Sequence, residues 1–449
     1  MLGEIVAVHA REVFDSRGRP TVEAEVTCRG GRPARAIAPA GASTGRAEAH
    51  ELRDGGPRLS GLGVRKAVAN VREEIGPALL GWNALAQAEI DRRMIELDAT
   101  PNKARLGANA ILAVSLATAY AAAEAKQTSI IEHLRELWLE QGGATPGPTL
   151  PLPMVNLISG GCHAGRQLEF QDFLAVPVGA ATFSEALDWI VTIYQCLGRD
   201  LRAAGYEGTL VGDEGGYGPK LANNEAAVQW VVQAVKQAGL RPGIDVVLAL
   251  DVAATHFCEH GRYRLPSLSA EPLSAAELTD YLDELVRRYP IVSLEDPLAE
   301  DDWEGWRRLT QRLGERVQVI GDDLFATNPH RLQRGVRSGA ANAVLIKLNQ
   351  IGTLTETLQT MRQAIETGYR PIISARSGET EDVTIADLAV ATGAGQIKIG
   401  SVARSERLAK YNQLLRWEEL AAGRWPFEGT QPLARWLSRG VNTPRERSE

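Results

Sequence analysis

The sequence has few cysteines and no long uninterrupted apolar run. Its 449 residues include four cysteines, with no CxxC pair and no spacing typical of a metal site: Cys28, Cys162, Cys196 and Cys258. The most apolar segment, 108–125, is broken by Asn109 and Ser115, which favours a buried helix over a membrane span. The N-terminal stretch carries Glu4 and lacks the apolar centre of a signal peptide. We therefore expect a reduced, cytoplasmic protein.

An excess of positive charge is also absent. The 49 Lys and Arg residues are outnumbered by 56 Asp and Glu residues, which gives a net charge of −7. This balance provides no basic footprint for nucleic acid and no attraction to anionic membranes. Apolar residues make up 44% and charged residues 23%, which excludes collagen-like, disordered and coiled-coil classes. The expected partner is a small molecule, with no nucleic acid and no membrane.

Lysine is the scarcest charged residue, with 8 lysines beside 41 arginines. Because arginine cannot lose its proton and so cannot act as a base, a lysine within an apolar strand is a candidate for that role. Lys347 follows AVLI, and Lys398 follows QI. Burial or nearby metal charge would lower the pKa of either lysine toward the working range, whereas a simple ion pair with a carboxylate is the structural alternative.

Two patterns divide the chain. Residues 4–28 alternate around the turn DSRGRP, which predicts a β-hairpin, and helical periodicity dominates 63–138. Beyond 153, short β runs alternate with amphipathic helices, which predicts a parallel sheet and fits a closed (β/α) barrel, with a doubly wound sheet as the competing fold. The predicted fold class is α/β. Its predicted divisions are 1–140 (an α+β domain), 141–152 (a linker), 153–430 (the barrel) and 431–449 (a polar tail).

Several of the predicted strands end in a charged residue that a core strand does not need. These residues are Asp251, Glu295, Asp322, Lys347, Arg376 and Lys398. Their spacings of 44, 27, 25, 29 and 22 residues each match one βα unit, with room for an insertion in the first. In a barrel the carboxyl ends of the parallel strands meet on one face, so we expect these side chains to converge.

Three of these residues, Asp251, Glu295 and Asp322, are carboxylates that would repel one another without compensating charge. A divalent metal resolves this repulsion. Because the ligands are all oxygen atoms, they select a hard cation, for which Mg²⁺ is the natural candidate. The alternative is that each acid caps the helix that follows its strand.

Further candidates lie in glycine-rich loops. GTLVGDEGGYGP at 208–219 places Glu214 beside two glycines that let the backbone approach a ligand, although DEGG also forms plain turns. His163 in SGGCHAG, and Gln171 with Asp172 in QDF, are additional polar candidates. The small, hydroxyl-bearing segment GAST has the composition of a lid. A metal, a lysine base and a carboxylic acid together suit removal of a proton α to a carboxylate, followed by departure of a β-leaving group.

Along nearly its whole length the sequence resembles the enolase family. The resemblance rests on REVFDSRGRPTVEAEV, GAST, GDEGGY, SLEDP, GDDL, IKLNQIGTLTE, RSGETED, GQIK and SERLAKYNQLLR. It implies an enolase-type C-terminal (β/α) barrel with an N-terminal α+β capping domain. It also implies Mg²⁺ as the cofactor, with a second ion bound together with substrate, and a homodimer or larger homo-oligomer.

At matching positions the resemblance implies a role for each candidate residue. The first Mg²⁺ would be held by the three carboxylates Asp251, Glu295 and Asp322. Ser43 of the GAST lid would reach the second ion. Lys347 would be the base and Glu214 the acid, with Asp172 working beside it. The carboxylate and phosphate of the substrate would be held by His163, Gln171, Arg376, Ser377 and Lys398.

Four positions depart from the family pattern, and none is a metal ligand or the lysine base. Ala375 stands where enolases carry histidine in SHRSGETED, and Asp172 stands where they carry glutamate in QEF. Ala40 replaces the serine of PSGAST, and Ile399 replaces the threonine of QIKTG. Shortening Glu to Asp withdraws a carboxylate by about 1.5 Å, and losing a proton-transfer group costs roughly 10²–10⁴-fold in rate. The pattern therefore favours retained α-proton chemistry on a changed phosphorus substrate.

The leading interpretation is an enzyme similar to carboxyphosphonoenolpyruvate synthase, an enolase homologue of phosphonate natural-product biosynthesis. Space opened at Ala375 would suit a bulkier phosphorus substituent. One alternative is ordinary enolase activity, the dehydration of 2-phosphoglycerate to phosphoenolpyruvate. Another is a non-catalytic relative with a binding or structural role, against which the intact Lys347 and acid triad argue. The expected partner is a small phosphorylated or phosphonylated carboxylate.

Overall fold

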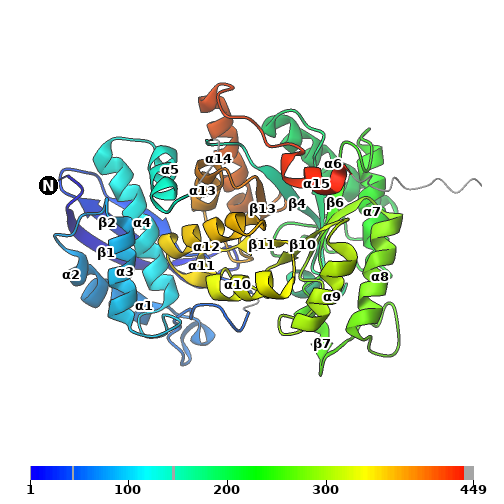
Figure 1. Ribbon diagram of the computed structural model, residues 1–449, viewed down its shortest axis with the longest axis horizontal. Helices are drawn as coiled ribbons and strands as arrows, with labels where there is room; N and C mark the ends of the chain where they lie inside the picture. The colour runs from blue at the N-terminus through cyan, green and yellow to red at the C-terminus, as the bar shows by residue number, and fades with distance from the viewer. Residues whose placement is uncertain (1, 43–44, 144–146, 439–449) are drawn as a thin grey trace, which may run out of the picture.

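The computed structural model describes residues 2–42, 45–143 and 147–438. Within these ranges an N-terminal unit of sheet and helices lies beside a larger barrel (Figure 1). Eight strands close the barrel in the order β10-β11-β12-β13-β4-β5-β6-β9. The predicted α/β fold class is therefore confirmed, and the doubly wound alternative is wrong.

The N-terminal unit is built on an antiparallel sheet of β1 (Ile5–Phe14), β2 (Pro20–Cys28) and β3 (Ala34–Ile37). β1 and β2 form the predicted hairpin. Alternate residues of β2 point to the same face, as the period of a strand requires, and Val22 and Ala24 are fully buried there. The helices that follow are η1 (Arg58–Gly61), α1 (Arg65–Asn70), η2 (Val71–Ile75), α2 (Gly76–Leu79), α3 (Gln87–Asp98), α4 (Ala108–Lys126) and α5 (Ile130–Glu140).

Helix α4 is the centre of the N-terminal unit. Within the described residues it is the one helix long and apolar enough to cross a membrane, and 83% of that window is buried inside the protein. It packs against β2 and β3 as well as α3 and α5. Its buried residues run around the whole helix, which is the pattern of a helix enclosed on all sides by protein.

The barrel strands alternate with helices along the chain, as predicted. The strands are β4 (Leu152–Ser159), β5 (Asp172–Val176), β6 (Val247–Asp251), β9 (Ile291–Glu295), β10 (Gln318–Gly321), β11 (Ala343–Ile346), β12 (Arg370–Ser374) and β13 (Gln396–Gly400). The helices are α6 (Phe183–Ala203), α7 (Asn224–Gln237), α8 (Ala275–Arg288), α9 (Trp303–Leu313), α10 (Pro329–Ser338), α11 (Leu348–Ile351), α12 (Leu354–Glu366), α13 (Thr384–Thr392) and α14 (Ser405–Ala421). Between β6 and α8 the chain inserts η4 (Ala254–Phe257) and the small hairpin of β7 (Cys258–Glu259) and β8 (Arg262–Tyr263). This insertion accounts for the long first spacing in the sequence.

Strand β5 differs from the predicted parallel sheet. It runs antiparallel to both β4 and β6, whereas the other neighbouring pairs around the barrel are parallel. The connection between β4 and β5 holds only the short turn η3 (Gly161–Ala164). A parallel connection usually needs a crossover helix, which this short connection lacks, so the chain folds directly back.

The barrel interior forms its own apolar core. Alternate residues of the strands point inward, among them Leu152 and Met154 of β4. Leu433 and Trp436 belong to the same core, in η5 (Gln431–Leu433) and α15 (Ala434–Leu437) at the barrel end (Figure 1). The predicted polar tail is therefore wrong for its first residues, because these apolar side chains seal the barrel floor.

We expect Leu433→Ala to lower the free energy of unfolding by about 2–5 kcal/mol, because it leaves a cavity in a closed core. Leu433 is 0% exposed. Urea denaturation followed by circular dichroism measures the change. Leu420→Ala is the control: this side chain is 63% exposed, and its loss should cost less than about 0.5 kcal/mol. Equal effects of the two changes would contradict the sealing role.

Candidate active site

Most of the predicted site residues converge at the carboxyl ends of the barrel strands. A cavity of about 20 Å³ lies there, which is room for about one water molecule. Its lining contains His163, Gln171, Glu214, Asp251, Lys347, Arg376, Ser377 and Lys398, together with Ser374 and Ala375. Ser43, the expected ligand of a second metal, lies outside the described residues.

The strand register explains why the carboxylates meet. Asp251 and Glu295 end the neighbouring strands β6 and β9 and are paired in register. Asp322 follows β10, whose Ile320 is paired with Glu295. Because β5 is antiparallel, its first residue, Asp172, lies at this same rim and is paired with Asp251. The reversed strand thus brings a fourth carboxylate to the site from its beginning rather than its end.

Two lysines form ion pairs with the predicted metal ligands. Lys398 Nζ donates to Asp251 Oδ2 at 2.8 Å and to Glu295 Oε2 at 2.7 Å. Lys347 Nζ donates to Asp322 Oδ2. The ion pairs considered as the structural alternative for both lysines are therefore present, within the same cluster that the chemistry requires.

The carboxylates carry more negative charge than the site compensates. Burial raises the pKa of Glu295 well above its usual value, and repulsion from Asp251 adds to this rise. Gln171 Nε2 donates to Asp251 Oδ2 at 3.2 Å, while the buried Gln171 Oε1 has no hydrogen-bond partner among the described residues. A cation would stabilise both the unpaired oxygen of Gln171 and the carboxylates that repel one another. Because all of these ligand atoms are oxygens, they favour a hard metal ion. The residues present therefore fit a divalent metal ion.

Two acidic groups in the described chain have ligand atoms within 4.8 Å of one another, namely Asp296 with Asp322 and Asp323, and His163 with Asp172 and Glu214. Asp322 thus belongs both to the predicted trio and to a neighbouring group. Asp296 accepts the backbone N–H groups of Asp322 and Asp323 at 2.9 and 2.8 Å, which ties the turn after β10 to the end of β9. The acidic clusters could bind a metal ion at this rim.

The protonation of Lys347 differs from the neutral amine expected of a base. Burial alone would lower its pKa, but the nearby carboxylates, chiefly Asp322 and also Glu295, together outweigh burial and raise the pKa above its usual value. At Lys398 burial opposes two neighbouring carboxylates, which raise its pKa well above the usual value. Both lysines are therefore protonated as long as no metal ion neutralises the carboxylates. The pKa of Lys347 is raised less than that of Lys398.

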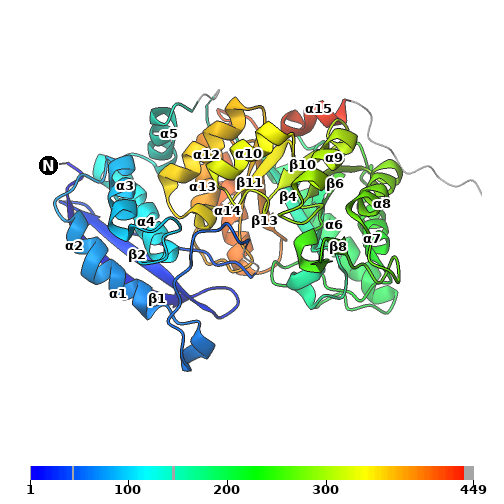
Figure 2. The ribbon, with the colours of Figure 1, turned by 60° about the horizontal axis from the view of Figure 1, so that its bottom comes forward.

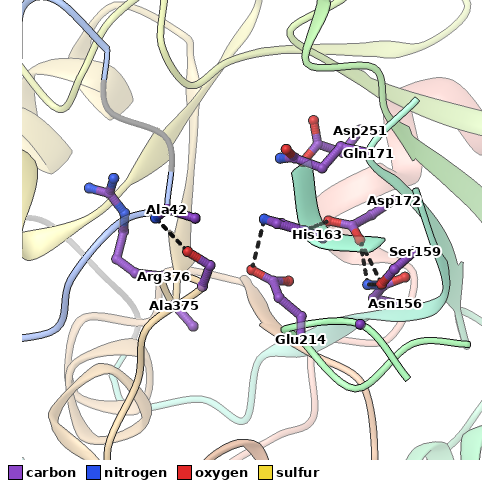
Figure 3. Close-up of polar contacts among 12 residues, drawn as sticks. Ala42, Asn156, Ser159, His163, Gln171, Asp172, Glu214, Asp251, Ala375 and Arg376 are labelled. Carbon is purple, nitrogen blue, oxygen red and sulfur yellow. Dashed lines mark hydrogen bonds and ion pairs between the residues drawn. The ribbon is translucent and has the colours of Figure 1, made fainter. Parts of the chain in front are cut away.

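His163 lies between Asp172 and Glu214 (Figure 3). Its Nδ1 is 3.1 Å from Asp172 Oδ2, and its Nε2 is 3.8 Å from Glu214 Oε1. Burial would lower the pKa of His163, but the two carboxylates raise it to about 9. Burial raises the pKa of Asp172 to about 6. At Glu214 the charges of His163 and of the nearby Arg407 and lysines together outweigh burial and lower the pKa. A protonated imidazole thus links the two acids.

Glycines allow the Glu214 loop to approach β13 closely. Gly215 has a φ of +87°, and a Cβ there would lie 2.5 Å from Ala403 O. Gly400 has a φ of +110°, and a Cβ there would lie 2.9 Å from Glu214 O. Ser401 N donates to the same Glu214 carbonyl at 2.8 Å. Side chains at either glycine would push the loop away, so the position of Glu214 depends on both.

Ala375 and Arg376 lie across the site from His163 and Asp172 (Figure 3). The neighbouring Ser377 Oγ accepts the Ala42 N–H of the GAST segment at 2.6 Å. The N-terminal unit therefore reaches the barrel rim at the residues expected to bind phosphate. Figure 2 shows this blue segment running from the sheet toward the barrel.

Ala375 lies in the wall of the active-site cavity. It is 5% exposed and belongs to the apolar core, and its N–H donates to Lys398 O at 2.8 Å. The cavity beside it has a volume of about 20 Å³, which holds neither a phosphate nor a larger phosphorus group. The volume therefore does not distinguish between the two substrates, and the added room at Ala375 stays a prediction.

Several residues that hold the site were not found from the sequence. Glu48 and Asn349 bind Arg376, and Gln350 binds Asp322. Asn349 and Gln350 stand in IKLNQIGTLTE, two and three residues after Lys347. Their position at the end of a predicted strand could have identified them as site residues. Glu48 had no such signal, because its contact to Arg376 joins segments 328 positions apart in the chain.

Two protein-family models together match most of the chain. Residues 5–134 match the family model "Enolase, N-terminal domain", and residues 148–435 match "Enolase, C-terminal TIM barrel domain". A protein named Enolase from Acidothermus cellulolyticus is 54% identical over 415 residues, which cover 92% of this chain and 94% of that protein. Proteins named Enolase from two strains of Tropheryma whipplei, Twist and TW08/27, are 51% identical over 434 residues, covering 96% of this chain and 99% of theirs.

Proposed function

The chain belongs to the enolase family, and from this membership we propose that it dehydrates 2-phosphoglycerate to phosphoenolpyruvate. It is an enolase-superfamily lyase. The observation that carries the proposal is the cavity at which Lys347, Glu214 and the metal-type carboxylate Asp251 meet. Each group has a task in breaking the C–H bond and then the C–O bond of this substrate.

The preference for a carboxyphosphonoenolpyruvate synthase gives way to ordinary enolase activity. Relatives that are 54% and 51% identical over most of the chain carry the name Enolase. The cavity of about 20 Å³ beside Ala375 gives no support to the larger phosphorus group. Neighbouring side chains can repack around a smaller residue such as Ala375. Residue size alone therefore does not identify the substrate.

Asp251, Glu295 and Asp322 are the residues that would hold the metal ion, and Mg²⁺ is our proposal for it. When bound, a divalent cation takes up the negative charge that otherwise keeps Lys347 protonated, and it neutralises the charge that builds on the substrate carboxylate. Gln171, with its unpaired Oε1 beside Asp251, supplies a further oxygen on this side of the site.

Lys347 takes the α-proton in the proposed reaction. Its Nζ lies at the cavity and, within the described residues, is bonded to one carboxylate, whereas Lys398 is bonded to two. Lys347 is therefore the lysine more easily deprotonated, and Lys398 stays cationic to bind the substrate carboxylate. The electron pair of the broken C–H bond moves toward that carboxylate.

Glu214 delivers a proton to the departing β-hydroxyl group. The proton comes from the linked group of Glu214, His163 and Asp172, which holds protons on the imidazole and, near pH 6, on Asp172. The C–O bond breaks and water leaves. Across the cavity, Arg376 and Ser377 hold the phosphate, for which a guanidinium fork is well suited.

The test is turnover of 2-phosphoglycerate. With Mg²⁺ present, we expect the ultraviolet absorbance of the enol ester to rise with time, and a chelator to stop the rise. Absence of turnover, together with a new phosphonate ester in phosphorus NMR after addition of nucleotide-activated phosphonoformate, would overturn the proposal in favour of the specialised reaction. A homo-oligomeric state and a cytoplasmic location stay predictions.

A further inference from the structure

Glu48 forms a buried two-bond ion pair with the residue proposed to bind phosphate. Arg376 Nη1 donates to Glu48 Oε2 at 2.9 Å, and Nη2 donates to Glu48 Oε1 at 3.2 Å. The side chains are 4% and 6% exposed. Two parallel hydrogen bonds fix the plane of a guanidinium group as well as its position. The orientation of Arg376 is therefore set from the N-terminal unit, outside the barrel.

Glu48 is itself held in place. The Gly45 N–H donates to Glu48 Oε1 at 3.0 Å, and Gln350 Nε2 lies 3.4 Å from the same oxygen. Asn349 Oδ1 accepts a second hydrogen bond from Arg376 Nη1 at 2.9 Å. Glu48 and Asn349 thus form a rigid support for the arginine.

This support lies behind the arginine and away from the reaction. Glu48 and Asn349 line a separate cavity of about 560 Å³, whereas Arg376 lines the active-site cavity of about 20 Å³. Neither supporting residue lines the active-site cavity. Glu48 therefore acts on a ligand through other residues, directly through Arg376 and more weakly through Gln350, which also binds Asp322.

Other carboxylates compete for the arginine. Asp322 and Asp323 also attract the Arg376 charge, and Asp322 already accepts from Lys347. Without Glu48, the long arginine side chain would be drawn toward these acids. It would then leave the phosphate side and neutralise a carboxylate that the metal ion needs.

We propose that Glu48 is a positioning residue, which holds Arg376 at the phosphate subsite and apart from the metal-binding carboxylates. The proposal rests on the proposed function in one respect, namely that the ligand carries a phosphate group. It extends the binding machinery to a residue of the N-terminal unit that does not touch the ligand.

The experiment is a calorimetric titration of the full chain with 2-phosphoglycolate in the presence of Mg²⁺. This probe has a carboxylate and a phosphate but no β-carbon, so it binds without reacting. For Glu48→Gln we expect the dissociation constant to rise roughly 10–100-fold, the range for lost hydrogen bonds to charged groups. The KM for 2-phosphoglycerate should rise by a similar factor, and kcat should fall by a smaller one, because the phosphate itself does not react.

Glu12→Gln is the matched control. It breaks another two-bond ion pair of the N-terminal unit, the one that Glu12 accepts from Arg58. Its phosphoglycolate affinity should stay close to that of the wild type. Asn349→Ala, which removes one bond to Arg376, should weaken binding less than Glu48→Gln and keeps the proposal testable if the latter fails to fold.

Unchanged phosphoglycolate affinity in Glu48→Gln would overturn the positioning role, as would an equal loss in Glu12→Gln. Loss of kcat without a change in KM would overturn it as well. The titration does not depend on turnover. A wild-type protein that binds phosphoglycolate but leaves 2-phosphoglycerate unchanged therefore refutes the proposed function and still decides the role of Glu48.

Discussion

Lys347→Ala is expected to lower the turnover of 2-phosphoglycerate by roughly 10²–10⁴-fold, the usual cost of losing a general base. The physical reason is the position of its Nζ at the active-site cavity, with a single carboxylate, Asp322, bonded to it. The more direct measurement is proton NMR in deuterated water. In the variant, the α-proton of 2-phosphoglycerate should cease to exchange with solvent, because no other group takes it.

Two further variants control this result. Lys347→Arg keeps the positive charge but should be equally inactive, because arginine does not release its proton. Lys103→Ala removes another buried lysine, which donates to Glu356 Oε1 at 3.0 Å and lies outside the cavity lining. It should retain proton exchange even if it unfolds more easily. Exchange at the wild-type rate in Lys347→Ala would refute the base assignment and favour a non-catalytic role.

Glu214→Gln is expected to lower turnover by a similar factor, roughly 10²–10⁴-fold, but for a different reason. The amide cannot deliver a proton to the departing hydroxyl group, so the C–O bond stays intact. The α-proton should still exchange with deuterium, because Lys347 is untouched. The pair of variants therefore separates the two bond-breaking steps.

The neighbouring acid provides the control for Glu214→Gln. Asp213 belongs to the same loop but does not line the cavity, so Asp213→Asn should keep most of the turnover. Loss of proton exchange in Glu214→Gln would show that Glu214 takes part in the first step. Persistent turnover in that variant would instead point to Asp172 or His163 as the proton donor, since both are linked to Glu214.

Charged residues at the ends of apolar strands mark the centre of the candidate site in the sequence. A charged residue at the end of an apolar strand is costly unless it has a function, and barrel topology brings such ends together. Asp251, Glu295, Lys347 and Lys398 were found in this way, and the register places them at one rim. This inference needed only the local pattern of each strand and the closure of the barrel.

Other features depended on contacts that a local pattern does not contain. The direction of β5 follows from the length of its connection and from pairing with both neighbours. The sealing of the barrel by Leu433 and Trp436 depends on where the chain returns after α14. The protonation of Lys347 depends on Asp322, a side chain from another strand. The strand direction, the sealing of the barrel and the lysine protonation all depend on contacts between segments that are distant in the sequence.

The amino-acid sequence alone determined the α/β class, the hairpin, the alternation of strands and helices, and the residue types that meet at the candidate site. These follow from periodicity and from the cost of charge in an apolar strand, which are local. Only the tertiary structure decided that a histidine links two acids and that Glu48 supports Arg376. The physical reason is that packing density and ion pairing depend on distances between segments, which the folded chain alone specifies.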